Sequence, residues 1–310
     1  MPGLVMGSVA GILGGGTWQG QARGQEGGAN MDLPDRRERF RAAVERPDDE
    51  IDLPYVALLI AEAAYPGLDI RYYLRELARL SAEAPRIDLS APPRQQIAVL
   101  SRYYTVDLGF RGNTEAYDDP RNSYLNDVLD RRTGIPITLT LVYNEIGRRL
   151  GLPLAGIGLP GHFLSGYVPT GARTPVLLID VFNGGVILDD RGVAALLERA
   201  FGRPVAVEPQ FLQPVGARAI LYRMLNNLKR IYVQAGDLHR ALEIVEQMVI
   251  VQPNSLRDVR DRGVLRGRLG HYAEALADLR LYAEQVQDEE ERAAAQREIA
   301  WVRQMMARLS

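Results

Sequence analysis

A pattern in the last third of the chain returns after 34 positions, and this internal repeat restricts the fold more than any other feature. Gly236 recurs as Gly270, and Ala241 recurs as Ala275. A repeat of this length is a supersecondary unit in which two helices pair and each pair packs on the next. Residues 211–310 are therefore predicted to form an all-helical module.

The first copy of the repeat keeps the intervals of a tetratricopeptide unit. Its characteristic positions hold Leu228, Tyr232, Gly236, Ala241 and Pro253. The second copy is degraded, because Arg266 stands at the tyrosine position and Gln287 at the proline position. Since fewer than three repeats rarely fold alone, we expect the pair to pack against the middle of the chain or against a last helix at residues 289–309.

The chain contains no cysteine, and this restricts its chemistry. Disulfides, thiolate zinc sites, iron–sulfur clusters and thiol nucleophiles are excluded. The single lysine, Lys229, follows leucine instead of glycine, so a Walker A phosphate loop is excluded as well. A net charge of −2 creates no general attraction to nucleic acid, and no apolar run is long enough to cross a membrane. The sequence therefore predicts no binding to nucleic acid or to a membrane. It also shows no group of metal ligands and no cofactor motif.

The first 30 residues hold ten of the 30 glycines and only two charged side chains. Because such a segment cannot bury a core, we interpret residues 1–30 as a tail or a miscalled start. Between residues 35 and 110 the apolar residues recur at helical spacing, which predicts several antiparallel helices. A further helix is expected at residues 123–131, with Asn122 as its N-cap.

The period of the sequence changes in the middle of the chain. A helix is predicted from Pro136 to Leu150, since proline is well placed in a first turn. Short apolar runs follow and predict strands at Ala155–Leu159, His162–Val168, Val176–Val181 and Val186–Leu188. Asn183-Gly184-Gly185 is the expected hairpin turn between the last two strands. We predict a helix packed on an antiparallel sheet, and hence an α+β protein.

Two residues in this region suggest acyl-transfer chemistry. If Val168 opposes Thr174 in a hairpin, His162 faces Asp180, and the carboxylate can orient the imidazole as in a nucleophilic triad. The start of the predicted helix offers Thr138 as a hydroxyl nucleophile. The alternatives are a structural histidine, a strand-end aspartate and a helix-capping threonine.

Two other motifs are interpreted as structural. Residues 156–161 match G-x-G-x-x-G, but they precede a strand, and Pro160 has no amide to offer a phosphate. The run Arg257–Gly263 alternates in charge, which is more typical of a solvated helical face than of a site for phosphate or an acidic peptide.

Four separated motifs together resemble the SirB-type transglutaminase-like family with C-terminal tetratricopeptide repeats. They are Tyr117–Asn126, Gly134–Leu139, Gly158–Phe163 and Ile179–Gly185, and similarity continues in Arg223–Lys229 and Arg260–Gly263. The resemblance implies a papain-like transglutaminase core in which His162 and Asp180 hold the histidine and aspartate positions. It places the nucleophile at or beside Pro136 to Thr138, where this chain has no cysteine. It also implies a bacterial, cytoplasmic protein, with a transglutaminase-like domain at residues 31–210.

The leading functional hypothesis is a pseudoenzyme that acts as an adaptor for proteins or peptides. Its expected cleft residues are Asn122, Asn126, His162 and Asp180, and its expected repeat-surface residues are Tyr232, Asn226 and Asn227. The alternative is an amide or ester hydrolase or acyl transferase, with Thr138 as nucleophile, His162 as base and Asp180 as orienter. A third hypothesis assigns the His162–Asp180 pair to stability alone.

Overall fold

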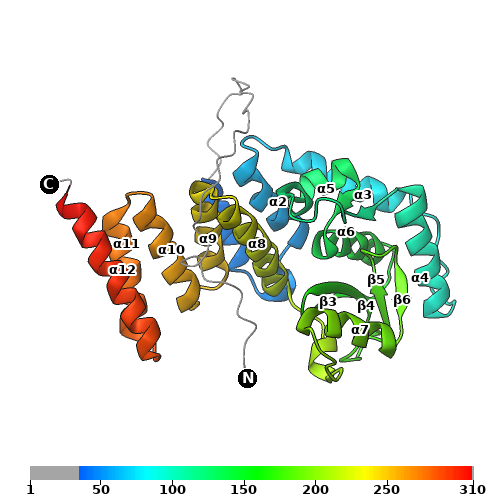
Figure 1. Cartoon of the computed structure of the whole chain (residues 1–310). Helices are drawn as coiled ribbons and strands as arrows, with labels where there is room; N and C mark the ends of the chain where they lie inside the picture. Colours follow the sequence, from blue (N-terminus) through cyan, green and yellow to red (C-terminus); the bar gives the residue numbers. More distant parts are fainter. Residues whose placement is uncertain (1–34, 309–310) are drawn as a thin grey trace. The chain divides into compact units, whose positions relative to one another are not determined.

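The computed structural model describes residues 35–308 and confirms an α+β architecture (Figure 1). Two compact units are present, one of residues 42–224 and one of residues 225–308 with the segment 35–41. The division falls inside helix α8 (Ala217–Gln234), later than the boundary predicted near residue 210. The predicted tail, residues 1–30, lies outside the described residues.

The unit of residues 42–224 begins with helices that match the predicted helical region. It contains α2 (Leu53–Ala64), α3 (Ile70–Ala82), α4 (Pro93–Arg102), α5 (Leu125–Arg131), α6 (Pro136–Arg149), α7 (Asp190–Phe201) and the short turns η2 (Asp48–Glu50), η3 (Tyr103–Asp107), η4 (Pro120–Asn122) and η5 (Pro209–Leu212). Asp52 and Asp69 accept hydrogen bonds from the first-turn amides of α2 and α3, as N-cap residues do. The predicted cap of α5 is wrong, because Asn122 ends η4 and Tyr124 precedes the helix without a side-chain cap.

The predicted four-stranded antiparallel sheet is present. Its order is β3 (Leu154–Leu159), β4 (His162–Tyr167), β5 (Leu177–Asp180) and β6 (Val186–Leu188). Neighbouring side chains on β4 point to opposite faces. Ser165 donates to Asn144 of α6, whereas Leu164 packs in a cluster with Leu197 of α7. The sheet is therefore covered by α6 on one face and by α7 on the other (Figure 1).

The register of the β4–β5 hairpin differs from the prediction by two residues. Ser165 pairs with Ile179 and Tyr167 with Leu177, so continuing the ladder places Asp180 opposite Leu164 instead of His162. Pairing stops at Tyr167 because the prolines at positions 169 and 175 have no amide hydrogen to donate. A two-residue shift keeps every side chain on the predicted face, whereas a one-residue shift would reverse them all.

A second, two-stranded sheet was not predicted from the sequence. Its strands β1 (Arg111–Gly112) and β2 (Thr133–Gly134) pair in parallel. Gly112 packs so closely on Phe182 that a Cβ at this position would lie 2.7 Å from the ring. This contact holds the loop after β1 next to the end of β5.

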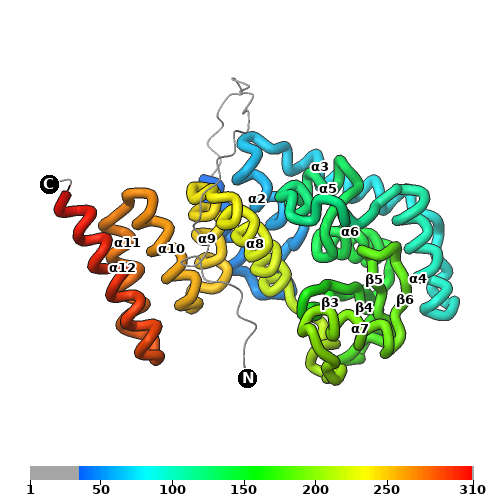
Figure 2. The backbone as a smooth tube through the Cα atoms, in the orientation of Figure 1, coloured from blue at the N-terminus to red at the C-terminus, as the bar shows by residue number. Residues whose placement is uncertain are grey.

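The other unit has the predicted repeat of helical pairs (Figure 2). After the end of α8 come α9 (Leu238–Val251), α10 (Leu256–Arg268), α11 (Tyr272–Gln285) and α12 (Glu289–Ala307). Gly236 and Gly270 have φ values of +71° and +84° and make the same left-handed turn in the two copies. Helix α12 packs on α11 through Tyr282 and Ala295, so the degraded pair does pack on the last helix.

Buried charges lie between the helices of this unit. Lys229 Nζ is 3.3 Å from Asp258 and 3.1 Å from Asp261, and all three side chains are buried. Arg262 pairs with Asp278 of α11. The interpretation of Arg257–Gly263 as a solvated network is therefore wrong, because its two aspartates, three residues apart on α10, both face inward toward lysine.

Candidate functional site

His162 and Asp180 meet at one end of the four-stranded sheet. The imidazole Nε2 lies 3.0 Å from Asp180 Oδ1. His162 directly follows the two-residue turn Pro160-Gly161, in which Gly161 has φ +70°, as the third residue of a type II turn requires. The shifted register makes the two residues diagonal neighbours, and the long imidazole spans that separation.

Asp180 is held in place as a carboxylate. Its Oδ2 accepts from the Asn183 side chain at 2.7 Å, and its Oδ1 accepts from the Asn183 amide at 3.2 Å. Burial acts to raise the pKa of Asp180, but the hydrogen bond and charge of His162 and the two bonds from Asn183 outweigh it, so the pKa lies below its ordinary value. The pair thus has the hydrogen-bond geometry of the histidine and aspartate of a nucleophilic triad.

The second ring nitrogen of His162 is available to a ligand. Nδ1 has no hydrogen-bond partner within residues 35–308, and the side chain is 11% exposed. The Phe182 ring stands edge-on to the imidazole at 6.1 Å between centroids, and the Tyr117 ring stands 6.1 Å from Phe182. Tyr117 is 41% exposed. An aromatic surface therefore extends from the histidine to solvent.

Thr138 is placed as a cap of α6. The side chain is fully buried, and its Oγ1 donates to the Asn122 carbonyl at 2.7 Å and accepts from the Ile135 amide at 3.2 Å. No hydrogen bond joins Thr138 to His162 within the described part of the chain. Both hydrogen bonds of the hydroxyl are made at the start of α6, as expected for a threonine that caps the helix.

Asn122 and Asn126 are both buried near the start of α5. Asn122 donates to the Ala116 carbonyl at 2.7 Å and accepts from Asn113 at 3.0 Å, and these bonds hold the loop that carries Tyr117. Asn126 Oδ1 is buried without a hydrogen-bond partner in residues 35–308. Asn122 therefore acts on the site through the loop, and Asn126 is left with an unsatisfied acceptor.

The three predicted repeat-surface residues lie on α8 in the unit of residues 225–308. Tyr232 is buried, with the Arg240 guanidinium 5.6 Å from its ring centroid. Asn226 and Asn227 are half-buried. Of the three, the asparagines are the ones that reach the surface of the unit.

Arg223 is a site residue to which the sequence analysis assigned no role. Its Nη2 donates to the carbonyls of Leu159 and His162 at 2.8 and 2.6 Å. The guanidinium also lies over the Phe163 ring, 5.4 Å from its centroid. Arg223 thus connects both ends of the turn that presents His162. No sequence signal separates it from the other arginines, because both of its partners are backbone atoms.

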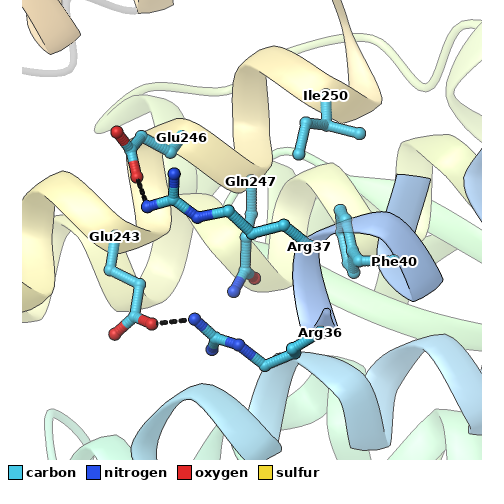
Figure 3. A pocket seen from close by; sticks show the side chains of 7 residues that line it. All are labelled: Arg36, Arg37, Phe40, Glu243, Glu246, Gln247 and Ile250. Carbon is cyan, nitrogen blue, oxygen red and sulfur yellow. Dashed lines mark hydrogen bonds and ion pairs between the residues drawn. The ribbon is translucent and has the colours of Figure 1, made fainter. Parts of the chain in front are cut away.

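A small pocket lies in the other unit, between α9 and the start of α1 (Arg36–Val44) (Figure 3). Arg36 pairs with Glu243, and Arg37 pairs with Glu246. Arg36 Nη1 and Gln247 Oε1 are buried in it without partners in the described chain.

Fold and site together define a transglutaminase-like domain followed by tetratricopeptide repeats. The family model described as transglutaminase-like superfamily matches residues 71–226, and the tetratricopeptide repeat model matches residues 228–301. The chain belongs to the UPF0162 family, which agrees with the SirB-type resemblance. It is 38% identical over 249 residues to a UPF0162 protein of Xylella fastidiosa, covering 76% of this chain and 84% of the relative. It is 30% identical over 237 residues to one of Vibrio cholerae, covering 76% and 87%.

Two other proteins are similar over a smaller part of the chain or with a lower structural similarity. Human F-box only protein 21 is 33% identical over 141 residues, which are 44% of this chain and 22% of that protein. A crystal structure of menin covers 86% of this chain and 75% of its own, with 14% identity and a TM-score of 0.40. Within residues 35–308, no helix combines the length and the apolar character needed to cross a membrane.

Proposed function

We propose that this protein is a non-catalytic adaptor of the cytoplasm that binds a protein or peptide at the His162 surface of its transglutaminase-like domain. A transglutaminase-like domain joined to tetratricopeptide repeats is an adaptor-like architecture, since such repeats suggest protein partners. The cytoplasmic assignment comes from the family resemblance. Fractionation of cells that produce the full chain would test it.

One observation carries the proposal: within residues 35–308, no hydroxyl is hydrogen-bonded to the oriented imidazole of His162. The chain has no cysteine, and the hydroxyl of Thr138 is buried and bonded to a backbone carbonyl. His162 keeps its hydrogen bond to Asp180 and leaves Nδ1 to a ligand. Such a ring can bond an amide or hydroxyl of a bound chain without chemistry.

The binding proposal is tested by affinity capture from cell extract with the full chain as bait. His162→Ala should remove the specific partners, because it removes the ring that presents Nδ1. His239→Ala is the matched control, since His239 is exposed in the tetratricopeptide unit. Equal capture by wild type and His162→Ala would place the partner surface elsewhere.

The catalytic alternative retains support from the His162–Asp180 hydrogen bond. It is tested by assaying the purified chain for hydrolysis of amide and ester substrates and for amine incorporation into glutamine peptides. We expect no turnover above that of the Asp180→Asn variant. Turnover that disappears in both Asp180→Asn and Thr138→Val would instead identify a hydroxyl-dependent acyl transferase.

A further inference from the structure

Asp180 is a buried carboxylate with which no lysine or arginine of the described chain forms an ion pair. Four aspartates are buried in residues 35–308, and the other three pair with Lys229 or Arg262. Asp180, which is 2% exposed, pairs with His162 instead. A neutral imidazole brings no charge, and buried charges are normally paired, so this pair lacks one positive charge.

The hydrogen bond to Asp180 also decides what the other ring nitrogen of His162 can bind. A carboxylate only accepts, so the proton of the neutral imidazole lies on Nε2, 3.0 Å from Asp180 Oδ1. Nδ1 then carries a lone pair and accepts a hydrogen bond. In the described chain, Nδ1 is not one of the buried polar atoms that lack a partner, so solvent reaches it. A ligand at this position must therefore donate.

Two aromatic rings continue the surface beside this acceptor. The half-buried Phe182 ring stands edge-on to the His162 ring, and the Tyr117 ring packs on Phe182. Gly112 fixes the position of Phe182, because a Cβ on Gly112 would lie 2.7 Å from the ring. Aromatic rings attract cations to their faces, and arginine is the cation found there most often. The rings thus favour a positively charged donor.

The loop that carries Tyr117 adds negative charge to this surface. Glu115 and Asp118 are exposed on either side of Tyr117, and Glu115 forms no ion pair within residues 35–308. Arg223 contacts the same hairpin as the imidazole, but its guanidinium lies over the Phe163 ring and donates to backbone carbonyls. Because neighbouring strand residues point to opposite faces, Arg223 does not occupy the imidazole face.

We propose that the His162 surface binds the guanidinium of an arginine side chain on a partner peptide. The guanidinium donates a hydrogen bond to His162 Nδ1, supplies the positive charge that Asp180 lacks, and stacks on the aromatic surface of Phe182 and Tyr117. Arginine suits this surface better than lysine, because a flat and weakly hydrated ion stacks on rings and an ammonium is a strongly hydrated point charge. This inference rests on the proposed binding role of the His162 surface, and it names the side chain recognised there.

The test uses the full chain and small probes, so it does not depend on finding a partner. The chain has three histidines, and their ring resonances report separately on His162 and on His239 and His271 of the other unit. The probes are the N-acetyl amides of arginine, of lysine and of citrulline, which has the shape of arginine without its charge. At about pH 8, where an ordinary imidazole is neutral, we expect a bare Nδ1 in the free protein. The arginine probe should shift the His162 resonance to saturation, the lysine probe should bind more weakly, and the citrulline probe should leave the resonance unchanged.

Substitutions then assign the affinity to the ring and to the carboxylate. Tyr117→Leu should weaken binding of the arginine probe about threefold or more, whereas Tyr117→Phe keeps the ring and should keep the affinity. Tyr72→Leu is the matched control, because Tyr72 is an exposed tyrosine of α3. Asp180→Asn should weaken binding by about tenfold, because it removes the charge that the guanidinium balances.

Several results would overturn the proposal. They are the absence of a saturable shift with the arginine probe, an equal response to the citrulline probe, an equal affinity in Tyr117→Leu, or parallel shifts of His239 and His271. Lysine that binds as tightly as arginine would refute the guanidinium, and a protonated Nδ1 in the free protein would mean that the imidazole itself balances Asp180.

Failure of this inference can be told from failure of the adaptor proposal. A failed titration alongside partner capture that needs His162 would refute the arginine site and leave the adaptor proposal standing. A successful titration without any captured partner would do the reverse.

Discussion

The buried charge cluster of the tetratricopeptide unit offers a quantitative test of how this unit is stabilised. Replacing Lys229 by methionine keeps most of the apolar stem and removes the side-chain ammonium of the single lysine. Asp258 and Asp261 would remain, with side chains 0% and 3% exposed, and each would lose its lysine partner. Two buried carboxylates without that counter-charge are expected to destabilise the fold.

The size of the effect follows from what remains around the carboxylates. Breaking a buried ion pair by removing one partner costs about 3–5 kcal/mol. Arg260 lies 3.2 Å from Asp261, and the Ser255 hydroxyl lies 2.6 Å from Asp258, so part of the compensation survives. We therefore expect the lower end, about 3 kcal/mol in the free energy of unfolding, or roughly a 150-fold change in the unfolding equilibrium.

Urea unfolding followed by circular dichroism measures this free energy. Arg280→Met is the control, because Arg280 is exposed on α11 and forms no ion pair in the described chain, and it should change stability by at most about 0.5 kcal/mol. Adding Asp258→Asn and Asp261→Asn to Lys229→Met should recover part of the loss by neutralising both carboxylates. A Lys229→Met variant as stable as the control would refute the reasoning.

Three further predictions concern the transglutaminase-like domain. Asp180→Asn should reduce stability at neutral pH. Because the pKa of Asp180 is lowered in the folded protein, the difference in stability from wild type should persist above pH 3.8 and vanish as the pH falls through the lower folded pKa. Unfolding measured at several pH values would show this dependence. Thr138→Val should lower the melting temperature and cost about 1–3 kcal/mol, because the buried Asn122 carbonyl loses its short bond from Thr138 and keeps only the longer one from the Ile135 amide; an unchanged value would contradict the cap. Gly161→Ala should cost about 1–2 kcal/mol at φ +70° and shift the His162 ring resonance, and an unmoved resonance would mean that the turn does not position the ring.

Local patterns accounted for the elements that the sequence predicted well. The start of α6 at Pro136 and the strand from Val186 to Leu188 follow from turn residues and apolar spacing within a few positions. The equivalent glycines Gly236 and Gly270, 34 residues apart, indicate the helical repeat from the sequence, and both have the positive φ of the same turn. Each of these features depends on contacts between residues that are near in the chain, so sequence alone can reveal them.

The β4–β5 register required more than local pattern. Alternation placed His162 and Asp180 on one face, but it could not decide between registers that differ by two residues, since both bury the same side chains. The prolines on either side of the loop ended the ladder early. The hydrogen bond between His162 and Asp180 survived because diagonal neighbours on a sheet still lie within reach of a long side chain.

The amino-acid sequence by itself determined the α+β class, the repeated helical pairs, the lack of a thiol and the candidate histidine and aspartate. Only tertiary structure decided that the Thr138 hydroxyl caps α6, that Asp258 and Asp261 are buried on Lys229, and that Arg223 spans the turn before His162. These outcomes depend on backbone carbonyls and on partners far away in the chain. A carbonyl is present at every residue, so only the folded positions determine which one a side chain reaches.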